Sequence, residues 1–127
     1  MAEHGVFYWN ELMTRDTDKA REFYGKSLGW TFTEMPMEED TYVVANLGEK
    51  PVGGIFPMNG PQFDGVPEHW MSYIAVDNVD ERLELAKSMG GEVLRPPFDV
   101  PGIGRIAILK DPGDAVQGWM TPADMTG

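Results

Sequence analysis

Cysteine is absent from this chain of 127 residues, and its absence excludes several kinds of chemistry. Without thiols there is no disulfide framework, no thiolate nucleophile and no cysteine-ligated metal or cluster. No apolar run approaches the ~20 residues that a membrane-spanning helix needs. The first residues, MAEHGVFYWNEL, contain neither the basic nor the apolar region of a signal peptide. We therefore expect a cytoplasmic protein.

Basic residues are also scarce, with 10 Lys and Arg against 21 Asp and Glu, which gives a formal net charge of -11. Such a surface repels phosphate backbones and anionic lipid headgroups, so we expect neither a nucleic-acid partner nor a membrane partner. It could steer a cationic ligand, or it could only keep a small protein in solution. The length and the 42% of hydrophobic residues fit one globular domain over residues 1–127.

One pattern occurs twice in the sequence, from Trp9 to Gly29 and again from Met71 to Gly90. Each copy passes from an alternating strand through an Asx-capped helix to a glycine. Trp9 matches Met71, Asp16 matches Asn78 and Asp18 matches Asp80, all at an offset of 62. A repeated unit of this size buries its apolar face only by packing with its copy, which leaves a shared concave surface. We expect the functional site on that surface.

The periodicity within each copy predicts a strand, a helix and three further strands. Module one covers residues 5–58, a linker rich in Gly and Pro covers 59–68, and module two covers 69–123. Asp16 or Thr17 is the predicted cap of the first helix, and Asn78 is that of the second. The predicted buried stripes are Ala20, Phe23, Tyr24 and Leu28 in the first helix, and Val79, Leu83, Ala86 and Met89 in the second.

The predicted strands after the first helix are residues 30–35, 42–47 and 51–58. Those after the second helix are 92–101, 105–110 and 115–121, and the first of these is limited to an edge or irregular strand by Pro96 and Pro97. The predicted fold class is α+β, built from two βαβββ modules.

Four segments carry a resemblance to a known family: TRDTDKAREFYGKSLGW, PVGG, YIAVDNVDE and KDPGDA. Together with the duplicated modules, they resemble the vicinal oxygen chelate superfamily, which includes glyoxalase I, bleomycin-resistance proteins and extradiol dioxygenases. The resemblance covers residues 6–122 and implies a cup of mixed β-sheet with the helices outside. It does not fix the reaction, because one scaffold carries many chemistries.

The resemblance also implies positions for a divalent metal ion, held by His, Glu or Gln from the first and last strand of each module. In this sequence those positions are Trp9 and Met71, a residue within 52–55, and Gly118. None is a credible ligand for a hard cation. Glu11 and His69 share strand faces with Trp9 and Met71, but two ligands are too few for a tight site. We predict no metal and no other cofactor.

Large soft side chains occupy the inward positions, which suits a planar or apolar organic ligand or simply a filled core. The candidate ligand-binding residues are Phe7, Trp9, Glu11, Met71, Tyr73 and Met120. Glu11 is the candidate polar anchor and general acid or base, and His69 is a candidate proton carrier. Alternatively, Glu11 is a solvated or Arg-paired carboxylate and His69 a surface residue at a strand entry.

Three functions remain open. The first is a binding protein of the bleomycin-resistance type that lacks the family's metal ligands and holds a small organic molecule in an aromatic cup. The second is a lyase or isomerase of the glyoxalase type in which Glu11 or His69 moves a proton, although metal-dependent glyoxalase or dioxygenase activity is not expected. The third is a dimeric accessory domain with a filled cup. An exposed sheet edge favours a homodimer.

Overall fold

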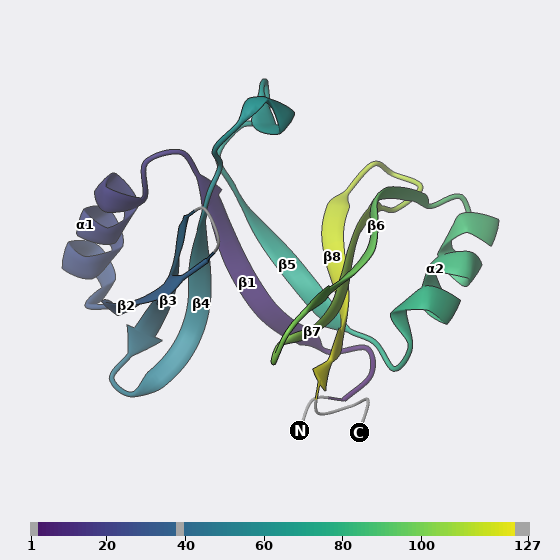
Figure 1. Cartoon of the computed structure of the whole chain (residues 1–127), viewed down its shortest axis with the longest axis horizontal. Helices are drawn as coiled ribbons and strands as arrows, with labels where there is room; N and C mark the ends of the chain where they lie inside the picture. Colours follow the sequence, from purple (N-terminus) through teal and green to yellow (C-terminus); the bar gives the residue numbers. More distant parts are fainter. Residues whose placement is uncertain (1–2, 38–39, 124–127) are drawn as a thin grey trace. The chain divides into compact units, whose positions relative to one another are not determined.

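The computed structural model describes residues 3–37 and 40–123, and these form two successive runs of strand, helix and three strands (Figure 1). The first run is β1 (Phe7–Thr14), α1 (Thr17–Leu28), β2 (Thr31–Pro36), β3 (Thr41–Leu47) and β4 (Lys50–Pro57). After a short 3-10 helix, η1 (Pro61–Phe63), the second run is β5 (His69–Ala75), α2 (Val79–Ser88), β6 (Glu92–Val100), β7 (Gly104–Lys110) and β8 (Val116–Pro122). The predicted α+β class and the two βαβββ modules are confirmed.

Contacts divide the described residues into two compact units, each of which contains one α-helix. The α1 unit is residues 9–71, and the α2 unit is residues 3–8 together with 72–123. Neither helix in the described part of the chain is long and apolar enough to cross a bilayer.

In the α1 unit the strand order is β2-β3-β4-β1, with β1 parallel to β4 and β3 antiparallel to both of its neighbours. One face of this sheet packs against α1 through an apolar cluster. Its members are Leu12, Val43 and Ile55, with Ala20, Tyr24 and Phe32 packed against them. Because side chains alternate along a strand, Glu11 and Gly54 belong to the opposite face, which we call the open face of the α1 unit.

Helix α1 begins and ends where local chemistry predicts. The Asp16 carboxylate accepts a hydrogen bond from the Lys19 backbone N–H at 2.9 Å, and Gly29 closes the helix in the left-handed region with φ 76°. The predicted buried stripe is wrong for Phe23 and Leu28, which are 62% and 53% exposed. Tyr24 is the ring of this helix that packs against the cluster, and it stacks on Trp30 with 5.5 Å between the ring centroids. The exposed Phe23 ring lies edge-on to Tyr24 at 4.9 Å.

The α2 unit has the equivalent strand order, β6-β7-β8-β5, with β5 parallel to β8. Its core is Val76, Val79, Leu83, Ala107 and Leu109. Asn78 caps α2 as predicted by accepting from the Glu81 backbone N–H at 3.1 Å. Met89 is 76% exposed, and its predicted burial is wrong because the helix ends at Ser88 and Met89 is the cap residue, with non-helical φ and ψ.

Strand β6 is the edge strand of the α2 unit, as the two prolines predict. Its pairing with β7 shifts register between Val93 and Arg95, and again between Arg95 and Phe98, the interval that contains Pro96 and Pro97. Proline has no N–H to donate to a ladder, so these residues are tolerated only where pairing is interrupted.

The two units place equivalent residues in equivalent register. Glu11 of β1 pairs with Gly54 of β4, and Tyr73 of β5 pairs with Gly118 of β8. In each unit a large side chain of the first strand therefore stands opposite a glycine of the last strand.

Candidate functional site

A hydrogen-bonded cluster of three side chains lies on the open face of the α1 unit. The Trp9 indole donates from Nε1 to the Tyr42 hydroxyl at 2.9 Å, and that hydroxyl donates to Oε2 of Glu11 at 3.4 Å. Glu11 is only 8% exposed, whereas Trp9 and Tyr42 are half-buried. We call these three residues the Glu11 cluster. Its carboxylate is not a solvated surface group.

Strand periodicity and register bring these residues together. Trp9 and Glu11 are two positions apart on β1 and therefore share a face. On β3, Val44 pairs with Gly54, which puts Tyr42 on the same face two positions away. A Cβ atom at Gly54 would collide with the Tyr42 hydroxyl and ring, so the missing side chain is what lets Tyr42 reach Glu11.

The direction of the hydrogen bonds in this cluster is fixed by the chemistry of its members. An indole N–H only donates, a tyrosine hydroxyl has a single proton, and an ionised carboxylate only accepts. Since the hydroxyl accepts from Trp9, its own proton points toward Glu11. Burial, and next the negative charge of Glu11, raise the pKa of Tyr42 far above its ordinary value, so the hydroxyl stays protonated in neutral solution.

The raised pKa of Tyr42 predicts a loss of stability in alkali. The neutral phenol is favoured in the folded state, so its contribution is fully present below the ordinary pKa of 10.0 and is lost as the pH rises beyond it. We expect the free energy of unfolding to fall more steeply above pH 10.0 in the wild type than in Tyr42→Phe, as measured by urea unfolding. Equal slopes in the two proteins would contradict the assignment.

In the α2 unit the Tyr73 ring occupies the space beside Gly118, as Tyr42 occupies the space beside Gly54 in the α1 unit. It is 8% exposed, and a Cβ atom at Gly118 would collide with its ring. Met120, on the same face of β8, is 3% exposed. Of the other predicted ligand-binding residues, Met71 is 7% exposed in the α1 unit and Phe7 is 73% exposed in the α2 unit.

His69 lies where the 59–68 segment enters β5. Its Nδ1 is 2.8 Å from the Pro67 carbonyl oxygen, and the neighbouring Glu68 forms an ion pair with Arg15 at 2.9 Å. The imidazole is thus held by the segment before the strand.

Tyr42 is the member of the Glu11 cluster that the sequence does not predict. It reaches Glu11 of β1 from β3, across the one intervening strand β4, and that register is not visible from periodicity alone. The available signal was the pair Gly53-Gly54 inside a strand, since a glycine there often marks close approach by another group.

The positions at which the family resemblance implies a metal ion do not offer a suitable donor set. The indole of Trp9 donates to Tyr42, Met71 carries a thioether, and the places beside Gly54 and Gly118 are taken by the rings of Tyr42 and Tyr73. A hard divalent cation prefers carboxylate, imidazole or carbonyl ligands. Over residues 3–37 and 40–123, no three His, Asp or Glu side chains gather as a metal site would require.

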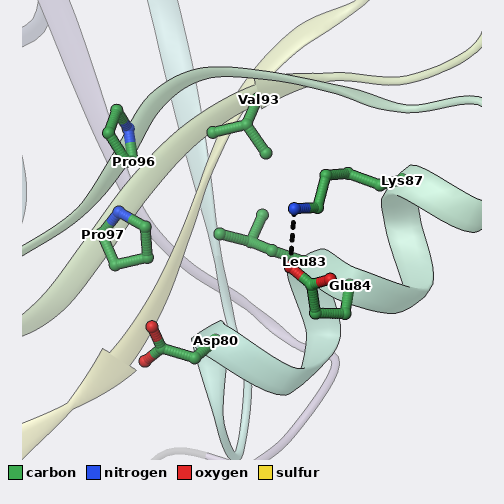
Figure 2. A pocket seen from close by; sticks show the side chains of 7 residues that line it. All are labelled: Asp80, Leu83, Glu84, Lys87, Val93, Pro96 and Pro97. Carbon is green, nitrogen blue, oxygen red and sulfur yellow. Dashed lines mark ion pairs between the residues drawn. The ribbon is translucent and has the colours of Figure 1, made fainter.

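Two cavities of the α2 unit lie on its helix side, and neither is lined by the Glu11 cluster. Figure 2 shows one of about 450 Å³ between α2 and β6, where Lys87 forms an ion pair with Glu84 at 2.6 Å. The Asp80 carboxylate at its rim is bound by Arg105 at 2.8 Å. The other, of about 560 Å³, is lined mainly by apolar side chains that include Leu85, Met89 and Trp119.

The repeated units define a fold that solved structures share. Methylmalonyl-CoA epimerase from Mycobacterium tuberculosis superposes with a TM-score of 0.66, covering 97% of this chain and 93% of that chain at 16% sequence identity. At this identity the likeness concerns the fold alone. The chain belongs to the Glyoxalase/Bleomycin resistance protein/Dioxygenase superfamily, whose family model matches residues 7–116. The resemblance found in the sequence is thereby confirmed.

Two curated relatives are similar along nearly all of this chain. A Mycobacterium bovis protein provisionally named glyoxylase CFP32 is 38% identical over 122 residues, which are 95% of this chain and 46% of that protein. The anthracycline biosynthesis protein DnrV of Streptomyces peucetius is 30% identical over an alignment 140 residues long. That alignment covers 97% of this chain and 51% of DnrV. The chain thus spans about half the length of the curated relatives it matches.

Proposed function

We propose that this chain binds a small organic molecule on the open face of the α1 unit, with the Glu11 cluster as its polar anchor. The observation that carries the proposal is a carboxylate only 8% exposed and hydrogen-bonded to a tyrosine on a sheet face that its own helix does not cover. Ligand sites commonly combine aromatic walls with a few placed polar groups. Trp9 and Tyr42 each supply an aromatic ring and a polar group.

Binding without a metal is part of this proposal. The residue types at Trp9 and Met71, and the tyrosine rings beside Gly54 and Gly118, support a member of the superfamily that has exchanged ion ligands for aromatic and apolar groups. A protein with a bleomycin-resistance type of function sequesters a molecule without changing it. Such a protein needs a binding surface but neither a metal ion nor a catalytic group.

A thermal-shift screen of planar organic compounds tests the proposal. A ligand at about 100 times its Kd stabilises the folded state by roughly 2.7 kcal/mol, which raises the Tm by several degrees. We expect Trp9→Ala to lose the shift, because it removes the aromatic wall and the donor to Tyr42. Phe23→Ala, which removes an exposed ring on the helix side of the same unit, should keep it. A full shift in Trp9→Ala, or none in the wild type, contradicts the proposal.

The second candidate is an isomerase or lyase in which Glu11 moves a proton next to a carbonyl. The observation that favours it is the same buried carboxylate, since burial is a common way to prepare a general base. The provisional glyoxylase name of one relative agrees with it. Proton transfer requires Glu11 to touch the substrate directly.

An assay with the methylglyoxal–glutathione adduct separates the two candidates. It is run with and without added divalent metals, alongside elemental analysis of the purified protein. A binder gives no turnover in any condition. Turnover that disappears in Glu11→Gln and persists in Glu49→Gln, a change of the same charge in the turn after β3, would establish the enzyme instead.

A further inference from the structure

The dipeptide Asn59–Gly60 follows β4 outside any helix or strand, and both of its residues are exposed. We propose that Asn59 is a site of spontaneous deamidation, and that the carboxylate formed there repels Asp40 and breaks the contact that Asn59 makes with the start of β3. This modification site shares no residue with the Glu11 cluster.

The reaction is an attack of the chain on its own side chain, in which the reacting groups are already neighbours. The backbone nitrogen of Gly60 gives up its proton and bonds to Cγ of Asn59. The bond from Cγ to Nδ2 breaks, and ammonia leaves with that proton, so that a five-membered succinimide forms. Water then opens the ring at either carbonyl and yields aspartate or isoaspartate. In balance, water is consumed and ammonia is released, and no oxidant or cofactor is needed.

Gly60 is the kind of following residue that hinders this attack least, because it has no side chain. Its φ of 104° lies in the left-handed region, and a Cβ atom there would collide with the Gln62 side chain, so the position requires glycine. The Gly60 carbonyl accepts from the Phe63 backbone N–H at 3.2 Å, whereas its own N–H has no acceptor within residues 3–37 and 40–123. The attacking nitrogen is therefore not held in a ladder or a helix.

The other three asparagines of the chain lack this combination. Asn10 and Asn46 lie within β1 and β3, where the sheet holds the backbone. Asn78 caps α2, and its Oδ1 accepts from the Glu81 backbone N–H at 3.1 Å. None of the three precedes a glycine. Asn59 alone combines exposure, irregular backbone and a following glycine, so the chain contains its own controls.

The product of the reaction faces a second carboxylate. Asn59 donates from Nδ2 to Oδ1 of Asp40 at 2.7 Å, and Asp40 directly precedes β3. Deamidation replaces this donor by a negatively charged acceptor, so a hydrogen bond becomes a repulsion between like charges. The contact that is lost lies at the entrance to β3, two residues before Tyr42.

Peptide mapping by mass spectrometry, during incubation of the folded protein in mildly alkaline buffer, tests the site. We expect Asn59 to lose its amide at least about tenfold faster than Asn10, Asn46 or Asn78, a difference of about 1.4 kcal/mol in the barrier. Aspartate and isoaspartate should both appear, and the rate should rise with pH because the attacking nitrogen must lose its proton. Asn59→Gln, which would have to close a larger ring, should keep its amide. Equal rates at the four asparagines, or a product without isoaspartate, overturn the assignment.

A charge swap tests the consequence for Asp40. Asn59→Asp imitates the product, and we expect it to lower the Tm by a few degrees, less so at high salt, where like charges are screened. Asn59→Ala, which removes the donor without adding a charge, should lower it less. Combining Asn59→Asp with Asp40→Asn again sets an amide opposite a carboxylate and should restore most of the lost Tm. An unchanged Tm in Asn59→Asp, or no recovery in the double variant, refutes the repulsion.

Discussion

Replacing Gly54 by alanine is expected to abolish ligand binding at the Glu11 cluster and to lower the free energy of unfolding by about 1–3 kcal/mol. The added Cβ would collide with the hydroxyl and ring of Tyr42, which occupy the space beside the glycine. The ring must then move, and its bonds to Trp9 and Glu11 are lost with it. Urea unfolding measures the loss of stability, and calorimetric titration with a compound identified by the thermal-shift screen measures the loss of binding.

A double-mutant cycle isolates the collision from other effects of the added methyl group. In Tyr42→Ala the ring is gone, so adding Gly54→Ala should change stability by less than about 0.5 kcal/mol, as for sites that do not interact. The single variant Tyr42→Phe is not a substitute, because the ring carbons of residue 42 also lie too close to the added Cβ. If Gly54→Ala is equally destabilising with and without the tyrosine ring, Tyr42 is not the group that excludes a side chain.

Replacing Ile55 by alanine should destabilise the protein by about 2–5 kcal/mol, as large-to-small changes in a packed core do. Ile55 has no exposed surface and packs with Leu12 and Val43 beneath α1. Truncation removes this apolar contact and leaves a cavity where the rigid sheet cannot collapse. The measurement is the midpoint and slope of urea unfolding.

Leu47→Ala is the control for this core substitution. Leu47 is 56% exposed at the end of β3, so the same kind of truncation should cost less than about 1 kcal/mol. In Ile55→Ala the affinity for ligand should stay within about twofold under conditions where the variant is folded, since its side chain points away from the open face. A small loss of stability in Ile55→Ala, no larger than in Leu47→Ala, would show that the cluster beneath α1 is not a packed core.

Ile55 and Gly54 are neighbours on β4 but belong to opposite faces of the sheet. Ile55 belongs to the face that α1 covers, and Gly54 belongs to the open face with Glu11. A change at one position should therefore alter stability with little change in affinity, whereas a change at the other alters both. This separation is what an alternating strand with one buried face provides.

The elements whose boundaries depend on nearby residues were predicted well from the sequence. Asp16 and Asn78 cap their helices through bonds to backbone groups three residues away, and Gly29 ends α1 in the left-handed region. The strands after each helix lie within a few residues of their predicted bounds at either end. Short-range hydrogen bonds and side-chain alternation decide all of these features.

Burial along the helices was predicted less well. Periodicity gave a stripe in each helix, yet Phe23, Leu28 and Met89 are largely exposed. The stripe identifies an apolar side but not how much of it the sheet covers. That amount depends on helix length and on which rings fill the adjoining space, as Tyr24 and Trp30 do beside α1.

The amino-acid sequence by itself determined the duplicated βαβββ organisation, the family and the presence of Trp9 and Glu11 on one strand face, because each follows from local pattern and spacing. Only the tertiary structure decided that Tyr42 joins them. Its hydroxyl reaches Glu11 because the register of β3 on β4 and of β4 on β1 sets the tyrosine over a glycine. Strand register is fixed by non-local pairing and packing, and a one-residue slip would have turned Tyr42 to the other face.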